Sequence, residues 1–178
     1  PDNHLPLLAA GMVAFAIIAR LLPHPANFAP IAALALFSGS YLPKGYVLWL
    51  PIAALIASDA VIGFYGITML YVYGSFFLTG LIGMWVKHHR SARIVLTASL
   101  LSSLLFFLIT NAGVWLDPLS GYAPGLNGLL ASYAAGLPFF RNTLLGDLTY
   151  TSVFFVGYEL ARYLAVRYLP ARIVPFLV

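Results

Sequence analysis

The sequence predicts an all-α integral membrane protein with six transmembrane helices in a single domain over residues 1–178. Three observations predict this class. Hydrophobic residues make up 62% of the chain and charged residues only 8%, against averages of about 45–50% and 25% in soluble proteins. The apolar residues gather in runs close to the roughly 20 residues that cross a bilayer. Nine Lys or Arg and five Asp or Glu are too few to cover a soluble globule of this size.

Polar, proline and glycine residues divide the chain into six apolar runs. The first run is too long and too apolar for a cleavable signal peptide, so we expect it to be retained. The second and third runs are short and separated by a tight turn, which leaves a re-entrant hairpin over 28–57 open as an alternative. The predicted spans are about 5–22, 28–43, 46–62, 67–86, 93–115 and 143–165.

The connection between the last two runs is much longer than the others. It extends from Asp117 to Asn142 and contains three prolines. Loops of this length in compact proteins are often lids or binding loops, and its apolar part, 126–136, predicts a short interfacial helix. Asn142 or Thr143 is then expected to cap the sixth span.

The distribution of Lys and Arg predicts the orientation. Cytoplasmic loops carry an excess of these residues. With six spans, one side carries Lys44, the 87–93 loop and the C-terminal tail, which together hold seven of the nine cations, and the other carries Arg20 and Arg141. Both termini are therefore predicted to lie in the cytoplasm.

Several chemistries are excluded by what the sequence lacks. There is no Cys, so there is no disulfide framework and no thiolate metal site. A Gly-rich phosphate loop and a His-Glu-x-x-His motif are also missing, which excludes an ATPase activity of its own. The cations are scattered rather than clustered, which argues against nucleic acid as a partner.

Polar side chains concentrate in the connections after spans one, three and five. These connections lie on the same, outer face of the membrane, and ionisable groups there usually face a cavity or each other. We therefore predict a pocket that is open to the outside. Its predicted lining residues are His24, Asn27, Asp59, Tyr71, Tyr73, Asn111, Trp115, Phe140, Arg141 and Asp147.

Each polar candidate also has a structural interpretation. Asn27 suits the N-cap of the second span, and Asp59 suits an ion pair with Arg20 or Arg141, or a contact with a ligand. Arg141 either neutralises Asp147 or reads the ligand. Aromatic residues such as Tyr73 suit either helix packing or a ligand cage.

Several motifs resemble those of a bacterial six-span family that is similar to the substrate-binding S-components of energy-coupling-factor (ECF) vitamin transporters and to the BtuM-like solitary cobalamin transporters. The motifs are Pro-His-Pro-x-Asn-Phe-x-Pro (23–30), Ala-Leu-Ala-Leu-Phe-Ser-Gly (33–39), Ser-Asp (58–59), Tyr-Val-Tyr (71–73), Ile-Thr-Asn-x-x-x-Trp (109–115) and Pro-Phe-Phe-Arg-Asn-Thr-x-x-Gly-Asp (138–147). The resemblance implies an S-component fold in a bacterial cytoplasmic (inner) membrane. It also implies an outer pocket and a cargo released inside.

The resemblance makes cobalamin the leading candidate for the cargo. BtuM-like members carry a pocket cysteine suited to cobalt, which this chain lacks, so His24 would be the replacement cobalt ligand. No intrinsic cofactor is expected. The protein would work either alone or with an ECF coupling subunit and its ATPases.

Two further functional classes stay open. One is an intramembrane enzyme that uses His24 with Asp59 or Asp147 as acid and base. The other is a non-catalytic membrane assembly subunit whose outer polar groups merely pair with each other. The vitamin-uptake hypothesis, without enzymatic activity, explains the number of outer polar groups better, because ligand pockets combine an apolar lining with a few placed polar groups.

Overall fold

A computed structural model describes residues 5–168, which are entirely helical apart from their connections and contain no strand. The elements are α1 (Leu5–Leu21), α2 (Ile31–Tyr41), α3 (Lys44–Ile62), α4 (Thr68–Val86), α5 (Ala92–Leu116) and α6 (Leu126–Tyr168). The predicted all-α class is confirmed for these residues. They form six helices, and α6 includes the segment 126–136, which was predicted as a separate interfacial helix. The chain termini, 1–4 and 169–178, lie outside the described residues. The prediction that both termini are cytoplasmic concerns these residues and stays a prediction.

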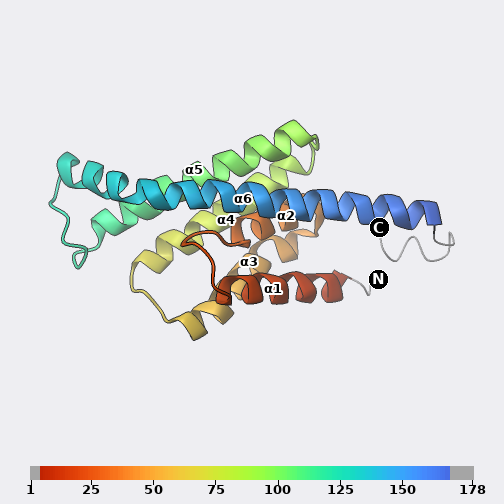
Figure 1. Cartoon of the computed structure of the whole chain (residues 1–178), viewed down its shortest axis with the longest axis horizontal. Helices are drawn as coiled ribbons and strands as arrows, with labels where there is room; N and C mark the ends of the chain where they lie inside the picture. The colour runs from red at the N-terminus through yellow and green to blue at the C-terminus, as the bar shows by residue number, and fades with distance from the viewer. Residues whose placement is uncertain (1–4, 169–178) are drawn as a thin grey trace.

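The helices run alternately up and down in one bundle (Figure 1). The connections 22–30, 63–67 and 117–125 lie at one end, which we call the distal end. The connections 42–43 and 87–91, the first residue of α1 and the last residue of α6 lie at the other, the terminal end. The three connections predicted to share a face do share one end of the bundle.

Three helices are long and apolar enough to cross a membrane, namely α3, α4 and α5. Helices α1 and α2 are apolar but shorter, with 17 and 11 residues. Helix α6 is much longer, with 43 residues, and includes more polar residues. The length and hydropathy that a membrane span requires are therefore met by the middle of the chain.

Helix α2 is the centre of the bundle. Residues 31–40 are all buried, and α2 packs against α3, α4 and α6. Its closest neighbour is α4, because glycines face each other where the two helices cross. A Cβ on Gly39 would collide with the Gly80 carbonyl, and one on Gly83 with the Leu36 carbonyl. Ser40 adds a hydrogen bond from its Oγ to the Gly83 carbonyl, at 3.2 Å.

The second helix begins later than predicted. It starts at Ile31, not at residue 28, and residues 22–30 form an irregular segment instead. Asn27 has a φ of 64°, a left-handed conformation incompatible with helix, and Pro30 occupies the N-cap position. The predicted N-cap role of Asn27 is therefore wrong.

The turn after α2 reaches the terminal end of the bundle. Tyr41 lies beneath Arg90 of the 87–91 connection, with the guanidinium carbon 4.7 Å from the ring centroid. Helix α3 then returns without interruption to Ile62 at the distal end. Residues 31–41 and 44–62 therefore form a short helix and a longer one that runs back along it, and whether both cross the membrane stays a prediction.

Helix α6 contradicts the predicted 117–142 loop. The connection is only 117–125, and one helix continues from Leu126 through Pro138 to Tyr168, so Asn142 and Thr143 are not caps. Proline in a helix interior removes a hydrogen bond and crowds the preceding turn. Packing on α5 compensates, because the Ser132 Oγ donates to the Asn111 carbonyl (2.8 Å) and the Tyr133 hydroxyl to the Leu108 carbonyl (3.1 Å).

Candidate functional site

Two adjoining cavities lie at the distal end. The larger, of about 470 Å³, is bounded by the 22–30 segment, α1, α3 and the middle of α6. The smaller, of about 350 Å³, lies between α4, α5 and the first half of α6. Both are lined by Ala26, Asn27, Val72, Phe106 and Thr143. The shared lining makes them two lobes of one site.

The irregular segment 22–30 forms the wall between the two lobes. Side chains hold its backbone in place, because the Asn142 amide donates to the Ala26 carbonyl at 3.0 Å. Gly146 on α6 lets the segment approach closely, since a Cβ there would lie 3.1 Å from the Cα of Phe28. The resembling motifs 23–30 and 138–147 are therefore in direct contact with each other.

His24 lines the larger lobe, but both of its ring nitrogens contact backbone carbonyl oxygens. Nδ1 lies 2.8 Å from the Pro25 carbonyl oxygen and Nε2 lies 3.0 Å from that of Arg20. Both nitrogens therefore face the carbonyl groups of the protein, and a cobalt ion would reach neither unless the ring turned. Among residues 5–168 no group of three or more His, Asp or Glu side chains is arranged to hold a metal.

Asp147 lines the larger lobe and is 3% exposed. Its Oδ2 accepts a hydrogen bond from the Ser103 hydroxyl at 2.6 Å, and no cation among the described residues forms an ion pair with it. The lining also includes two aromatic rings, Phe76 and Phe106, which stack with centroids 5.1 Å apart and an interplanar angle of 30°. The larger lobe thus combines an apolar wall with one carboxylate.

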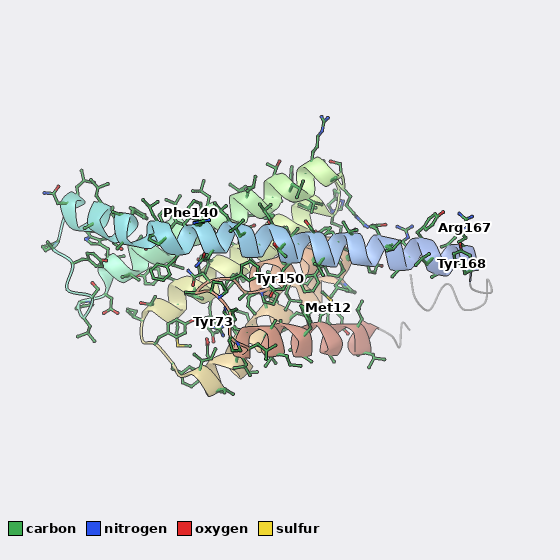
Figure 2. All side chains as sticks on the ribbon, in the orientation of Figure 1. Met12, Tyr73, Phe140, Tyr150, Arg167 and Tyr168 are labelled. Carbon is green, nitrogen blue, oxygen red and sulfur yellow. The ribbon has the colours of Figure 1, made fainter. Side chains whose placement is uncertain are left out.

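The smaller lobe contains two more of the predicted residues. Asn111 donates from Nδ2 to the Phe107 carbonyl at 2.8 Å, and Gly136 on α6 faces its amide so closely that a Cβ would collide with it. Phe140 packs on Phe107 with ring centroids 4.6 Å apart, on the part of α6 that lies along α5 (Figure 2). This lobe is lined by aromatic rings with an amide beside them.

Asp59 lies beside the larger lobe but does not line it. It is fully buried and forms an ion pair with Arg20, whose Nη1 lies 2.6 Å from Oδ1. The Tyr73 hydroxyl donates to Oδ2 at 2.8 Å, and Tyr73 lies near the distal ends of α1 and α3 (Figure 2). Arg20 also donates to the Ser58 hydroxyl. Of the partners proposed for Asp59, the structure selects Arg20.

Tyr65 in the 63–67 connection joins the same cluster. Its hydroxyl is 3.4 Å from Oδ2 of Asp59. Burial, and then the negative charge of Asp59, raise the pKa of Tyr65 to about 12. The phenol is therefore a stable neutral donor at the rim of the larger lobe, which it also lines.

Three predicted residues lie away from both lobes. Tyr71 packs against Gly113, where a Cβ would collide with its ring. Trp115 donates from Nε1 to the Ala123 carbonyl at 3.1 Å and so holds the 117–125 connection. Arg141 is exposed and pairs with neither Asp147 nor Asp59 among the described residues. It is six residues from Asp147, which places the two side chains about 120° apart around the helix.

Several lining residues were missed because they look like ordinary membrane-helix residues. Val72 and Thr143 lie inside the motifs 71–73 and 138–147 but carry no charge, and Phe106 lies outside every motif. Ser103 carries a weak signal, because it lies in a run with Ser99 and Ser102 on one side of α5. All three are buried, and Ser99 and Ser103 contact Thr151 and Asp147 of α6. Serines at this spacing in an apolar run predict a polar partner on the facing helix.

The acid–base pairs of the enzyme hypothesis are not formed in this structure. Among the described residues His24 makes no hydrogen bond to Asp59 or Asp147. Asp59 pairs with Arg20 and accepts a hydrogen bond from Tyr73, and Asp147 accepts one from Ser103.

Comparisons with known proteins identify the family of the chain and nothing narrower. Neither the curated proteins nor the solved structures contain a match, so the resemblance to S-components rests on the sequence motifs alone. A family model does match, over residues 2–171, which is nearly the whole chain. The chain belongs to this family, which is described as a family of unknown function (DUF6580).

Proposed function

We propose that this protein is a multi-pass protein of the bacterial cytoplasmic membrane that binds a vitamin-like small molecule in its distal cavity and delivers it inside. The observation that carries the proposal is the irregular segment 22–30, which walls both lobes of the cavity. Within a membrane, non-helical backbone is tolerated where it is buried in protein or lines a water-filled cavity. Irregular connections that a rigid scaffold holds in place also commonly carry binding residues.

In the proposed topology the chain crosses the membrane six times, with the distal end outside and both termini in the cytoplasm. The terminal-end segments carry Lys44, Lys87, Arg90, Arg93, Arg162 and Arg167. The distal end carries Arg20 and Arg141, and Arg20 is neutralised by Asp59. This asymmetry agrees with the rule that positive residues stay inside.

The size of the cavity bears on the cargo. Sites for drug-sized ligands have volumes of about 300–1,000 Å³, and the two lobes measure about 470 and 350 Å³. Their combined space favours a molecule smaller than cobalamin, which carries amide side chains and a nucleotide loop around its corrin ring. With both nitrogens of His24 on carbonyl groups, cobalt ligation would also need a rearranged 22–30 segment. Cobalamin should still be among the vitamins tested, because the chain resembles the BtuM-like cobalamin transporters.

Energy for uptake has to come from a gradient or from partner proteins, because the chain has no phosphate-binding loop. We propose the protein as the substrate-binding membrane component, acting alone or with an ECF coupling subunit and its ATPases. Co-purification from native membranes separates these two arrangements.

The decisive experiment is an uptake assay with a panel of vitamins, in cells that lack the corresponding uptake systems. A matched pair of variants assigns the activity to the cavity. Val72→Trp fills the space that both lobes share, and Val61→Trp adds the same bulk at an exposed position on α3. We expect uptake of one cargo with the parent and with Val61→Trp, and none with a folded Val72→Trp variant. Equal uptake by both variants would refute the cavity as the binding site.

A further inference from the structure

We propose that the ligand of the larger lobe is a cation whose positive charge pairs with Asp147. The inference rests on the proposed function and narrows its substrate to a class, namely small organic cations such as amines or quaternary ammonium compounds. It follows from the contrast between the two buried aspartates of the distal end.

Asp59 is a buried carboxylate whose charge is neutralised by a resident cation. It has a guanidinium at 2.6 Å and a phenol hydroxyl at 2.8 Å, and it faces neither lobe. Asp147 is nearly as buried, yet among the described residues it has only the neutral Ser103 hydroxyl, on Oδ2. The remaining oxygen, Oδ1, has no donor there, and the residue lines the larger lobe.

Among residues 5–168, no side chain is placed to become the counter-ion of Asp147. Helices α2 and α4 carry no charged residue, and α5 carries only Arg93 in its first turn, at the terminal end. The other charged or titratable groups of the same lobe are Arg20, His24 and Tyr65. The first is neutralised by Asp59, the second faces two backbone carbonyls, and the third donates to Asp59.

An unpaired carboxylate within a membrane is costly and usually belongs to a substrate or ion pathway. The lining around it suits a cation with apolar substituents, because it includes the aromatic rings of Phe76 and Phe106, and aromatic rings attract such groups. A lobe of about 470 Å³ has room for an organic cation, whereas a bare metal ion would need several carboxylate or imidazole ligands. Among the described residues no such ligand group exists.

The test measures thermal unfolding of the purified protein with matched pairs of probes. Choline is compared with dimethylbutanol, its uncharged carbon isostere, and benzyltrimethylammonium with neopentylbenzene. We expect at least one cation to stabilise the protein at a concentration about tenfold or more below that of its neutral isostere, the usual effect of a charge-assisted contact. Equal or absent stabilisation by both cations would overturn the cationic class.

Two variants assign the effect to Asp147. Asp147→Asn keeps an acceptor for Ser103 and removes the charge, so it should abolish the preference for the cation. Asp117→Asn removes an equal charge at the same end but outside both lobes, and it should leave the preference unchanged. A preference that survives in Asp147→Asn, or is lost in Asp117→Asn, would refute the assignment.

Failure of this inference can be told apart from failure of the proposed function. If the cargo found by uptake is neutral or anionic and Val72→Trp abolishes its transport, the cavity is a binding site and only the charge class is wrong. If Val72→Trp transports normally, the cavity itself is not the site.

Discussion

Arg20 is the residue on which the distal end of α3 depends. It neutralises a fully buried carboxylate and also donates to Ser58. We expect Arg20→Ala to lower the free energy of unfolding by about 3–5 kcal/mol, because it leaves Asp59 buried and uncompensated. The double variant Arg20→Met, Asp59→Leu should recover most of this loss, since replacing a buried pair by apolar residues is often neutral. Denaturant unfolding in detergent measures both, and a double variant no more stable than Arg20→Ala would contradict the explanation.

Arg141, unlike Arg20, neutralises no buried carboxylate among the described residues. Its side chain is exposed and without an ion-pair partner among residues 5–168. We expect Arg141→Ala to change stability by no more than about 0.5 kcal/mol, as is usual for surface substitutions, and to leave cargo affinity unchanged. Isothermal titration of the identified cargo, together with a melting curve, checks this. A tenfold loss of affinity would place Arg141 back in the binding site that its neighbours in the sequence suggested.

The packing of α2 on α4 provides a prediction at the scale of an element, because two glycines of α4 differ sharply in their surroundings. A Cβ on Gly83 would collide with the backbone of α2, whereas a Cβ on Gly74 meets nothing within 4 Å. Gly83→Ala should therefore destabilise the protein by about 1–3 kcal/mol, the usual cost of overpacking. Gly74→Ala should stabilise it by about 0.5–1 kcal/mol, because alanine is the better helix former. Equal effects of the two substitutions on unfolding would show that the crossing is looser than the structure has it.

Helix boundaries that depend on the local sequence were predicted correctly. Boundaries that depend on packing against other helices were not. The predicted span 67–86 agrees with α4 (Thr68–Val86), and 93–115 agrees with α5 (Ala92–Leu116), because apolar runs and polar breaks coincide there. Two helix boundaries were predicted wrongly, for different reasons. Pro138 lies inside a helix that packing on α5 sustains, and α2 starts late because Asn27 adopts a left-handed conformation that no local pattern announced.

The same distinction applies to the cavity. Alternating spans placed the polar connections at one end, and His24, Asn27, Asn111, Phe140 and Asp147 do line the two lobes. Asp59 and Tyr73 instead form a hydrogen bond with each other next to the larger lobe. The direction in which a side chain points from a helix depends on the packing of that helix, so Arg141 and Tyr71 were predicted at the right end but on the wrong side.

At the scale of the whole molecule, the alternation of helices predicts where tags will be found. A reporter fused after Val178 and one inserted in the 87–91 connection should both report the cytoplasm. A reporter near Gly121, in the 117–125 connection, should report the outside. Opposite signals from the first two reporters would require an odd number of crossings between them and would refute the six-span topology. As a control, each fusion protein should support the same uptake as the untagged protein, which shows that the inserted reporter has not disturbed the fold.

Helix α6 also has a mechanical consequence. Its 43 residues form one uninterrupted helix, about 65 Å long at 1.5 Å per residue. Thr143 lines the ligand cavity, and Glu159, four turns further along, borders a groove at the terminal end beside Arg90. A stiff rod shares any tilt along its whole length, so a rotation of about 10° at Thr143 moves Tyr168, roughly 38 Å away, by about 6–7 Å. A change in the tilt of α6 at the cavity would therefore displace the terminal end of the helix by several ångströms, so occupancy of the cavity could be sensed at the opposite surface.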